Sequence, residues 1–153
     1  MTNPLPRDEV FAISLGVRHE ALELRRMLES WGCVVSRSWV AGETRAAPNG
    51  RIIGGTWPNS FASARLEVPE DSRLASSLAH ALDTVSAHRD DIAAFVDKGG
   101  HAALFVGWGF ENTGGARLDW ELLARLAEFR IALDLDIYPR EPSELEDATH
   151  GQA

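Results

Sequence analysis

Residues 118–138 read LDWELLARLAEFRIALDLDIY, and this stretch predicts a helix that leads directly into a strand. Asp119 is suited to cap the helix, because its carboxylate can accept a hydrogen bond from a free N–H of the first turn. The predicted buried stripe of the helix is Trp120, Leu123, Leu126 and Ala127. The strand, 131–138, alternates as expected when only one face of a sheet is covered. Its apolar residues are Ile131, Leu133, Leu135 and Ile137, and between them stand Ala132, Asp134, Asp136 and Tyr138.

Upstream of this stretch, the spacing of the apolar residues is that of a strand in some segments and that of a helix in others. Strands are predicted over 10–17, 33–40, 57–68 and 101–110, and helices over 19–31, 69–85 and 90–98. Asp71 or Ser72 is expected to begin the second helix, and Asp90 is expected to cap the third. Gly32 suits the left-handed position that ends the first helix, and Gly99-Gly100 ends the third.

The order of these elements is β-α-β-β-α-α-β-α-β, with a strand-helix-strand crossover at each end. It predicts an α+β fold built on a single mixed sheet of about five strands, with helices mainly on one face. The stretch 42–55 is rich in Gly, Pro and Asn and has no clear period. Its length favours antiparallel pairing of the strands on either side of it.

The length and composition indicate one globular domain: the chain has 153 residues, of which 44% are apolar. Its net charge of −8 disfavours nucleic acid and anionic membranes as partners. Cys33 is the only cysteine, which is typical of a reducing compartment, and we expect it to be a buried structural thiol. With no signal sequence or membrane span visible, the protein is expected to be cytoplasmic. We place the domain at 9–140, between a flexible lead-in, 1–8, and a disordered acidic tail, 141–153.

Sequence motifs for cofactors and catalysis are missing or incomplete. Gly107 and Gly109 begin a dinucleotide-binding pattern, but Asn112 stands at the third glycine position. The stretch 109–115 has the glycine spacing of a phosphate-binding loop and lacks its lysine. His80 and His88 are eight residues apart and are expected on one helix, on roughly the same face, with no carboxylate to complete a zinc set. The sequence therefore predicts no cofactor, no metal and no catalytic residue.

One group of side chains is a candidate for contact with a ligand or a partner. Asp134 and Asp136 stand two apart on a strand and therefore project from the same face, and Tyr138 extends the row. His101 faces the same side if the last strand neighbours the strand 101–110. Such a group can be an ordinary exposed strand face, a metal or acid–base site, or a contact for a polar ligand.

The same face is expected to be shallow, because its remaining side chains are small. A ligand, a peptide or another subunit could approach it closely; alternatively, curvature of the sheet selects glycine there. These small residues are Ala12, Ser14, Gly16, Ala103, Gly107, Gly109 and Ala132. Trp39 and Trp57 flank the irregular stretch 42–55, where they either pin the loop or line a pocket.

The stretch quoted above resembles the C-terminal part of a bacterial family, the domain of unknown function numbered 4279, whose members end in a helix and a strand of this type. Further similarities are SRSWVAGE at 36–43, GTW at 55–57 and the leucine-bearing helix after Pro69. The chain departs from the family pattern at 30–36, which reads SWGCVVS. The resemblance covers residues 10–140, implies an α+β fold and a bacterial origin, and assigns no site, because the family has no assigned activity.

Without a catalytic group, the sequence favours a non-catalytic binding or interaction domain for a protein or a small ligand. Bacterial immunity proteins are one type of small acidic α+β protein with such a role. The alternative is a metal-assisted hydrolase that uses Asp134, Asp136 and His101. A third interpretation is a homodimer joined through the open sheet face or a sheet edge.

Overall fold

The computed structural model describes residues 9–69 and 73–139. The predicted lead-in 1–8, the tail 141–153 and the predicted helix start at Asp71 or Ser72 lie outside these residues. In the described ranges, the strands are β1 (Glu9–His19), β2 (Val35–Trp39), β3 (Thr44–Ala46), β4 (Ile52–Thr56), β5 (Ser60–Leu66), β6 (His101–Phe110) and β7 (Ile131–Pro139). The helices are α1 (Arg25–Ser30), α2 (Leu74–Thr84), α3 (Arg89–Asp97) and α4 (Trp120–Glu128), with a 3-10 turn, η1 (Ser86–His88).

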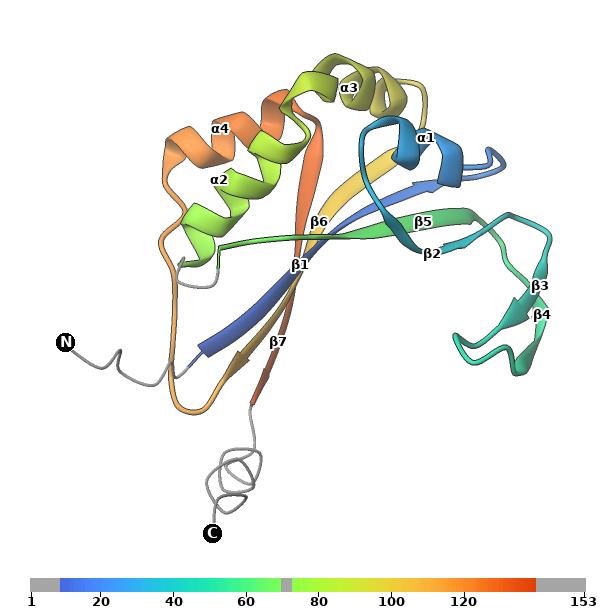
Figure 1. The fold of residues 1–153 in the computed structure, drawn as a ribbon, viewed down its shortest axis with the longest axis horizontal. Helices are drawn as coiled ribbons and strands as arrows, with labels where there is room; N and C mark the ends of the chain where they lie inside the picture. Colours follow the sequence, from blue (N-terminus) through green and yellow to red (C-terminus); the bar gives the residue numbers. More distant parts are fainter. Residues whose placement is uncertain (1–8, 70–72, 140–153) are drawn as a thin grey trace, which may run out of the picture.

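Five of the strands form one mixed sheet in the order β2-β5-β1-β6-β7, and β3 and β4 form a separate hairpin. Strands β6 and β7 are parallel, whereas the other neighbouring pairs are antiparallel. The four helices lie on one side of the sheet, and the hairpin extends beyond the ends of β2 and β5 (Figure 1). The predicted α+β fold and the antiparallel pairing of β2 with β5 are confirmed.

The core lies between the helices and one face of the sheet. On the central strand β1, Ile13, Leu15 and Val17 are fully buried, because alternate side chains point towards the helices. Leu28 of α1 and Leu78 of α2 are buried against them from the other side. The residues between these on β1 therefore point to the face that the helices leave uncovered.

Glycine ends two of the helices in the way that the sequence predicts. Gly32 has a φ of 81° after α1, and its N–H donates to the Glu29 carbonyl at 3.0 Å. Gly99 has a φ of 99° after α3, and its N–H donates to the Val96 carbonyl at 3.0 Å. Both backbones are left-handed, a conformation that glycine adopts without steric cost.

Asp119 caps α4 as predicted: its Oδ1 accepts a hydrogen bond of 3.0 Å from the Leu122 N–H. Replacing Asp119 with alanine removes this acceptor, so we expect the free energy of unfolding to fall by about 1 kcal/mol. Asp119→Asn keeps an acceptor oxygen and should cost less than half as much. Urea denaturation followed by circular dichroism checks both values, and equal losses for the two variants would contradict the capping role.

Several predicted boundaries were wrong because local hydrogen bonds end or begin elements inside the predicted range. His19 belongs to β1, and its Nδ1 accepts bonds from the N–H groups of Ala21 and Leu22, so a turn precedes α1. The stretch 42–55, expected to be irregular, contains β3 and β4. A tight turn joins them, in which Gly50 donates to the Ala47 carbonyl at 2.8 Å.

Three helical assignments were also wrong. The predicted buried stripe of α4 is correct only at Leu126: the helix buries Leu122 and Leu126, while Trp120 and Leu123 are 74% and 49% exposed and Ala127 is exposed too. Two overlapping apolar stripes are present in this sequence, and docking on the sheet edge selects the one that continues into Phe129. Asp90 lies in the first turn of α3 and not at its cap, which is His88. His80 and His88 do not share a helix, since His80 belongs to α2 and His88 to η1.

Candidate functional site

The uncovered face of the sheet has a floor of small side chains. Strand pairing aligns Ser63 of β5, Gly16 of β1, Ala103 of β6 and Ala132 of β7 in one row across the sheet. The same registers place every small residue that the sequence assigned to this face on that face. A side chain at Gly16 would meet the Phe61 ring only at an ordinary contact distance of 3.5 Å, so packing does not demand glycine there. The missing side chain instead leaves space above the strand.

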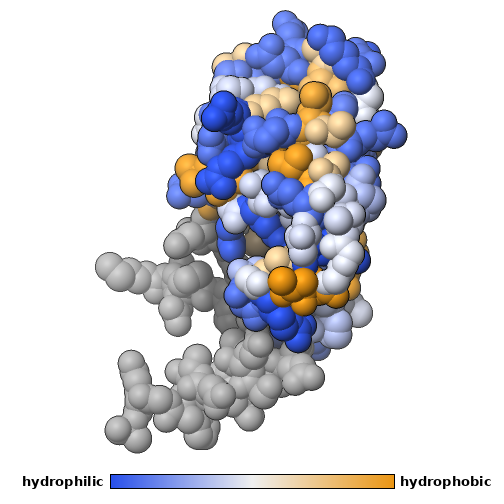
Figure 2. Space-filling model, turned by 90° about the vertical axis from the view of Figure 1, so that its right-hand side faces the viewer, coloured by the Kyte–Doolittle hydropathy of each residue, from blue (hydrophilic) through white to orange (hydrophobic). Residues whose placement is uncertain are grey.

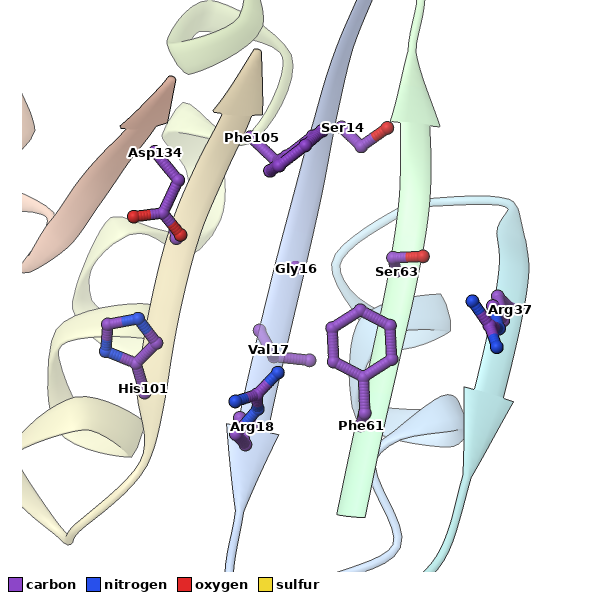
Figure 3. Close-up of a pocket in the computed structure, with 11 residues that line it drawn as sticks. Ser14, Gly16, Val17, Arg18, Arg37, Phe61, Ser63, His101, Phe105 and Asp134 are labelled. Carbon is purple, nitrogen blue, oxygen red and sulfur yellow. The ribbon is translucent and has the colours of Figure 1, made fainter. Parts of the chain in front are cut away.

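A groove of about 500 Å³ lies over this floor. One wall is the row formed by Phe61, Arg18 and His101, and the other contains Phe105 and Asp134. Figure 3 shows the two phenylalanine side chains on opposite sides of the point where Gly16 leaves the floor open. The groove therefore combines two aromatic walls with charged groups along both edges.

Three aromatic rings stack at the end of the groove next to the hairpin; we call Trp57, Trp39 and Phe61 the aromatic stack. The ring centroids of Trp39 and Trp57 are 4.0 Å apart, and those of Trp39 and Phe61 are 4.5 Å apart. The indole N–H of Trp39 donates to the Asn59 carbonyl at 3.0 Å, which fixes the middle ring. The stack joins the segment that follows β4 to the main sheet, so both tryptophans pin the loop, and both also line a small hollow beside it.

Each ring of the aromatic stack carries a guanidinium group. Arg45 lies 5.2 Å from the centroid of Trp57, Arg37 lies 4.8 Å from that of Trp39, and Arg18 lies 5.7 Å from that of Phe61. Attraction between a cation and the negative face of a ring holds such pairs together. Three arginines therefore gather at one end of a face in a chain whose net charge is −8.

These three arginines have no carboxylate partner among the described residues, unlike others in the same ranges. Arg25 pairs with Glu29 at 3.1 Å, Arg130 pairs with Asp97 at 3.5 Å, and Arg125 pairs with Asp83. Where the structure is described, the guanidinium groups above the aromatic stack form neither an ion pair nor a hydrogen bond, and the Nε of Arg45 is buried without an acceptor.

The structure brings together only part of the group that the sequence singled out. Asp134 and His101 both line the groove, whereas Asp136 and Tyr138 lie on the same face further along β7. Trp39 and Trp57 stand at the opposite side, in the aromatic stack.

The residues that sequence reasoning missed are the three arginines of the stack and the two aromatic walls. The sequence indicates them only weakly: Arg18 and Arg37 stand at the positions of β1 and β2 that point away from the helices. A net charge of −8 gives no indication of a local cluster of arginines.

Nothing in the described ranges assembles a metal centre: no three His, Cys, Asp or Glu side chains lie close enough together to hold an ion. Cys33 is buried, as predicted, and burial raises the pKa of its thiol. A thiol with a raised pKa stays protonated at neutral pH and is a poor nucleophile. The groove itself is lined by charged, hydroxyl-bearing and aromatic side chains.

Asp134 and Asp136 are both exposed on the uncovered face. Replacing both with asparagine is expected to change the free energy of unfolding by no more than about 0.5 kcal/mol, because each carboxylate is well solvated. Chemical denaturation of the double variant measures this. A change larger than about 2 kcal/mol in either direction would mean that the two side chains have buried partners.

The fold and the groove together define an α+β domain with helices on one side of its sheet and a ligand-sized hollow on the other. The chain belongs to the family described as a domain of unknown function (DUF4279), whose model matches residues 9–140. The resemblance seen in the sequence is thereby confirmed. No curated protein and no solved structure shows significant similarity to the chain. In the described part of the chain, no helix has the length and apolar character needed to cross a membrane.

Proposed function

We propose that this chain is a non-catalytic binding domain that takes up a small anionic ligand with a flat apolar part in the groove on its uncovered sheet face. One observation carries the proposal: Arg18 and Arg37 line the groove without a carboxylate partner in the described ranges, although the chain as a whole is acidic. A guanidinium group recognises a carboxylate or phosphate through two parallel hydrogen bonds.

The dimensions and walls of the groove support a small ligand. Its volume of about 500 Å³ lies within the range typical of small-molecule sites. Phe61 and Phe105 supply apolar surfaces against which a ring can stack. Ser14 and Ser63 add hydroxyl groups that both donate and accept hydrogen bonds.

The other interpretations have less support. A metal-assisted hydrolase that uses Asp134, Asp136 and His101 needs the three groups to converge, and Asp136 lies outside the groove. A protein partner, as for an immunity protein, or a second copy of the chain would need a far larger contact than this groove offers. We further propose a bacterial cytoplasm as the setting, since the single thiol of Cys33 is unpaired and the sequence resembles a bacterial family.

Benzoate, benzamide and benzamidine test the proposal, because they have nearly the same shape but carry a negative, a neutral and a positive group. Titration of the native chain with each, followed by the amide resonances in two-dimensional NMR, gives the affinities and the residues affected. Benzoate should shift the amides of Gly16 and Ala103 and bind about tenfold or more tightly than benzamide, since a hydrogen bond to a charged group is the stronger one. Benzamidine should not bind in the groove.

Binding of all three compounds with equal affinity, or of none, would contradict the proposal. A thermal-shift assay with Mg²⁺ and with Zn²⁺ tests the hydrolase interpretation. A metal that raises the melting temperature of the native chain, but not of Asp134→Asn, would favour that interpretation instead.

A further inference from the structure

A second hollow lies next to the groove, on the hairpin side of the aromatic stack. We call it the hairpin pocket; its volume is about 330 Å³, and Arg45, Trp57 and Trp39 are among its lining residues. Arg18 lines both the hairpin pocket and the groove. The two hollows therefore share one lining residue, Arg18. Figure 2 shows the end of the molecule where the hairpin lies, with apolar patches among largely polar residues.

Among the described residues, the side chain of Arg45 has an aromatic contact but no hydrogen bond and no ion pair. Its guanidinium group faces the Trp57 ring, and its Nε is buried with no acceptor. A buried donor without an acceptor is unfavourable, and most such groups in proteins have a partner. An anion in the hairpin pocket would give the remaining N–H groups of Arg45 a charged acceptor.

Of these two hollows, Arg37 lines the groove but not the hairpin pocket, and Arg45 lines the hairpin pocket but not the groove. We propose that the ligand carries two anionic groups on a rigid apolar spacer, one bound in the groove by Arg37 and the other in the hairpin pocket by Arg45, with Arg18 between them. This inference rests on the proposed function, whose ligand it specifies as a dianion. The shared chemistry is that of an aromatic dicarboxylate or a bisphosphate.

The aromatic stack favours a ligand whose two anionic groups point in opposite directions. Trp57 and Phe61 lie on opposite sides of Trp39, at centroid distances of 4.0 and 4.5 Å from it. Arg45 lies over Trp57 and Arg18 lies over Phe61, so these two guanidinium groups belong to opposite ends of the stack. Anionic groups at opposite ends of a six-membered ring point in opposite directions and can enter the two hollows, whereas anionic groups on neighbouring carbon atoms point the same way.

Terephthalate, phthalate and benzoate test this inference on the full chain. Terephthalate and phthalate carry the same charge, but only terephthalate places its two carboxylates at opposite ends of the ring. We expect terephthalate to bind about tenfold more tightly than benzoate, well above the twofold gain that two equivalent groups give by statistics. The affinity of phthalate should exceed that of benzoate by much less than the affinity of terephthalate does.

Arg45→Gln should remove the advantage of terephthalate and leave the affinity for benzoate within about twofold. Arg51→Gln is the matched control, because Arg51 is an exposed arginine of the same hairpin segment outside the pocket. A measurement on the native chain needs no variant: terephthalate, but not benzoate, should shift the indole N–H resonance of Trp57.

If benzoate binds but terephthalate binds no better than phthalate, the dianion is excluded and the proposed function stands. The same conclusion follows if Arg45→Gln weakens benzoate and terephthalate equally. If neither benzoate nor terephthalate binds, both the dianion and the proposed function are wrong.

Discussion

Replacing Leu104 with alanine is expected to lower the free energy of unfolding by about 3 kcal/mol. Leu104 is fully buried on β6, where it faces the helices from the middle of the sheet. Its truncation loses the burial of several methyl and methylene groups and leaves a cavity that the neighbouring strands cannot close. Few single substitutions in this chain should cost more.

Phe105 provides the matched control, since it follows Leu104 on the same strand and points to the opposite face. It is 45% exposed, so Phe105→Ala should cost no more than about 1 kcal/mol although it removes a larger side chain. Urea denaturation of both variants measures the difference. Equal losses, or a larger loss for Phe105→Ala, would mean that the face with the groove is covered in the native protein.

The double variant Arg18→Gln/Arg37→Gln is expected to weaken benzoate binding about a hundredfold or more. Each guanidinium contributes a charge-assisted hydrogen bond, and the loss of one such bond typically lowers affinity by a factor of ten or more. The cost in stability should be small, because an exposed cation–π contact contributes only about 0.5–1 kcal/mol. NMR titration gives the affinity, and thermal denaturation confirms that the variant is folded.

Arg65→Gln is the control for this experiment. Arg65 is exposed and pairs with Ser14 across β5 and β1, which places it on the same sheet face, but it does not line the groove. The substitution removes the same charge and should alter benzoate affinity by less than about twofold. A loss as large as that of the double variant would indicate a general effect of surface charge and no specific site.

Strand alternation made most of the sheet predictable from the sequence. The period-two pattern of β1, β6 and β7 assigns each side chain to a face, and one buried residue such as Ile13 fixes which face is covered. The alternation places Asp134 and the small residues on a common face, and the pairing of β6 with β7 adds His101 to it. The helix ends at Gly32 and Gly99 were predictable because they depend on local backbone geometry.

The remaining features depend on contacts between distant segments, which no local pattern encodes. Helix α4 contains two overlapping apolar stripes, and only docking against the sheet exposes Trp120 and buries Leu122. The aromatic stack joins residues on three segments, and its arginines have the sequence pattern of ordinary surface charges. The groove was therefore predicted as a shallow face, without the arginines Arg18 and Arg37 that line it.

The most direct test of the central claim is an intermolecular NOE experiment on the native chain with benzoate. If the groove binds the ligand, the ring protons of benzoate should show NOEs to the ring protons of both Phe61 and Phe105, which face the groove from its two walls. NOEs confined to an exposed apolar residue elsewhere, such as Trp120, would contradict the account, as would the absence of any NOE to either phenylalanine at saturating benzoate.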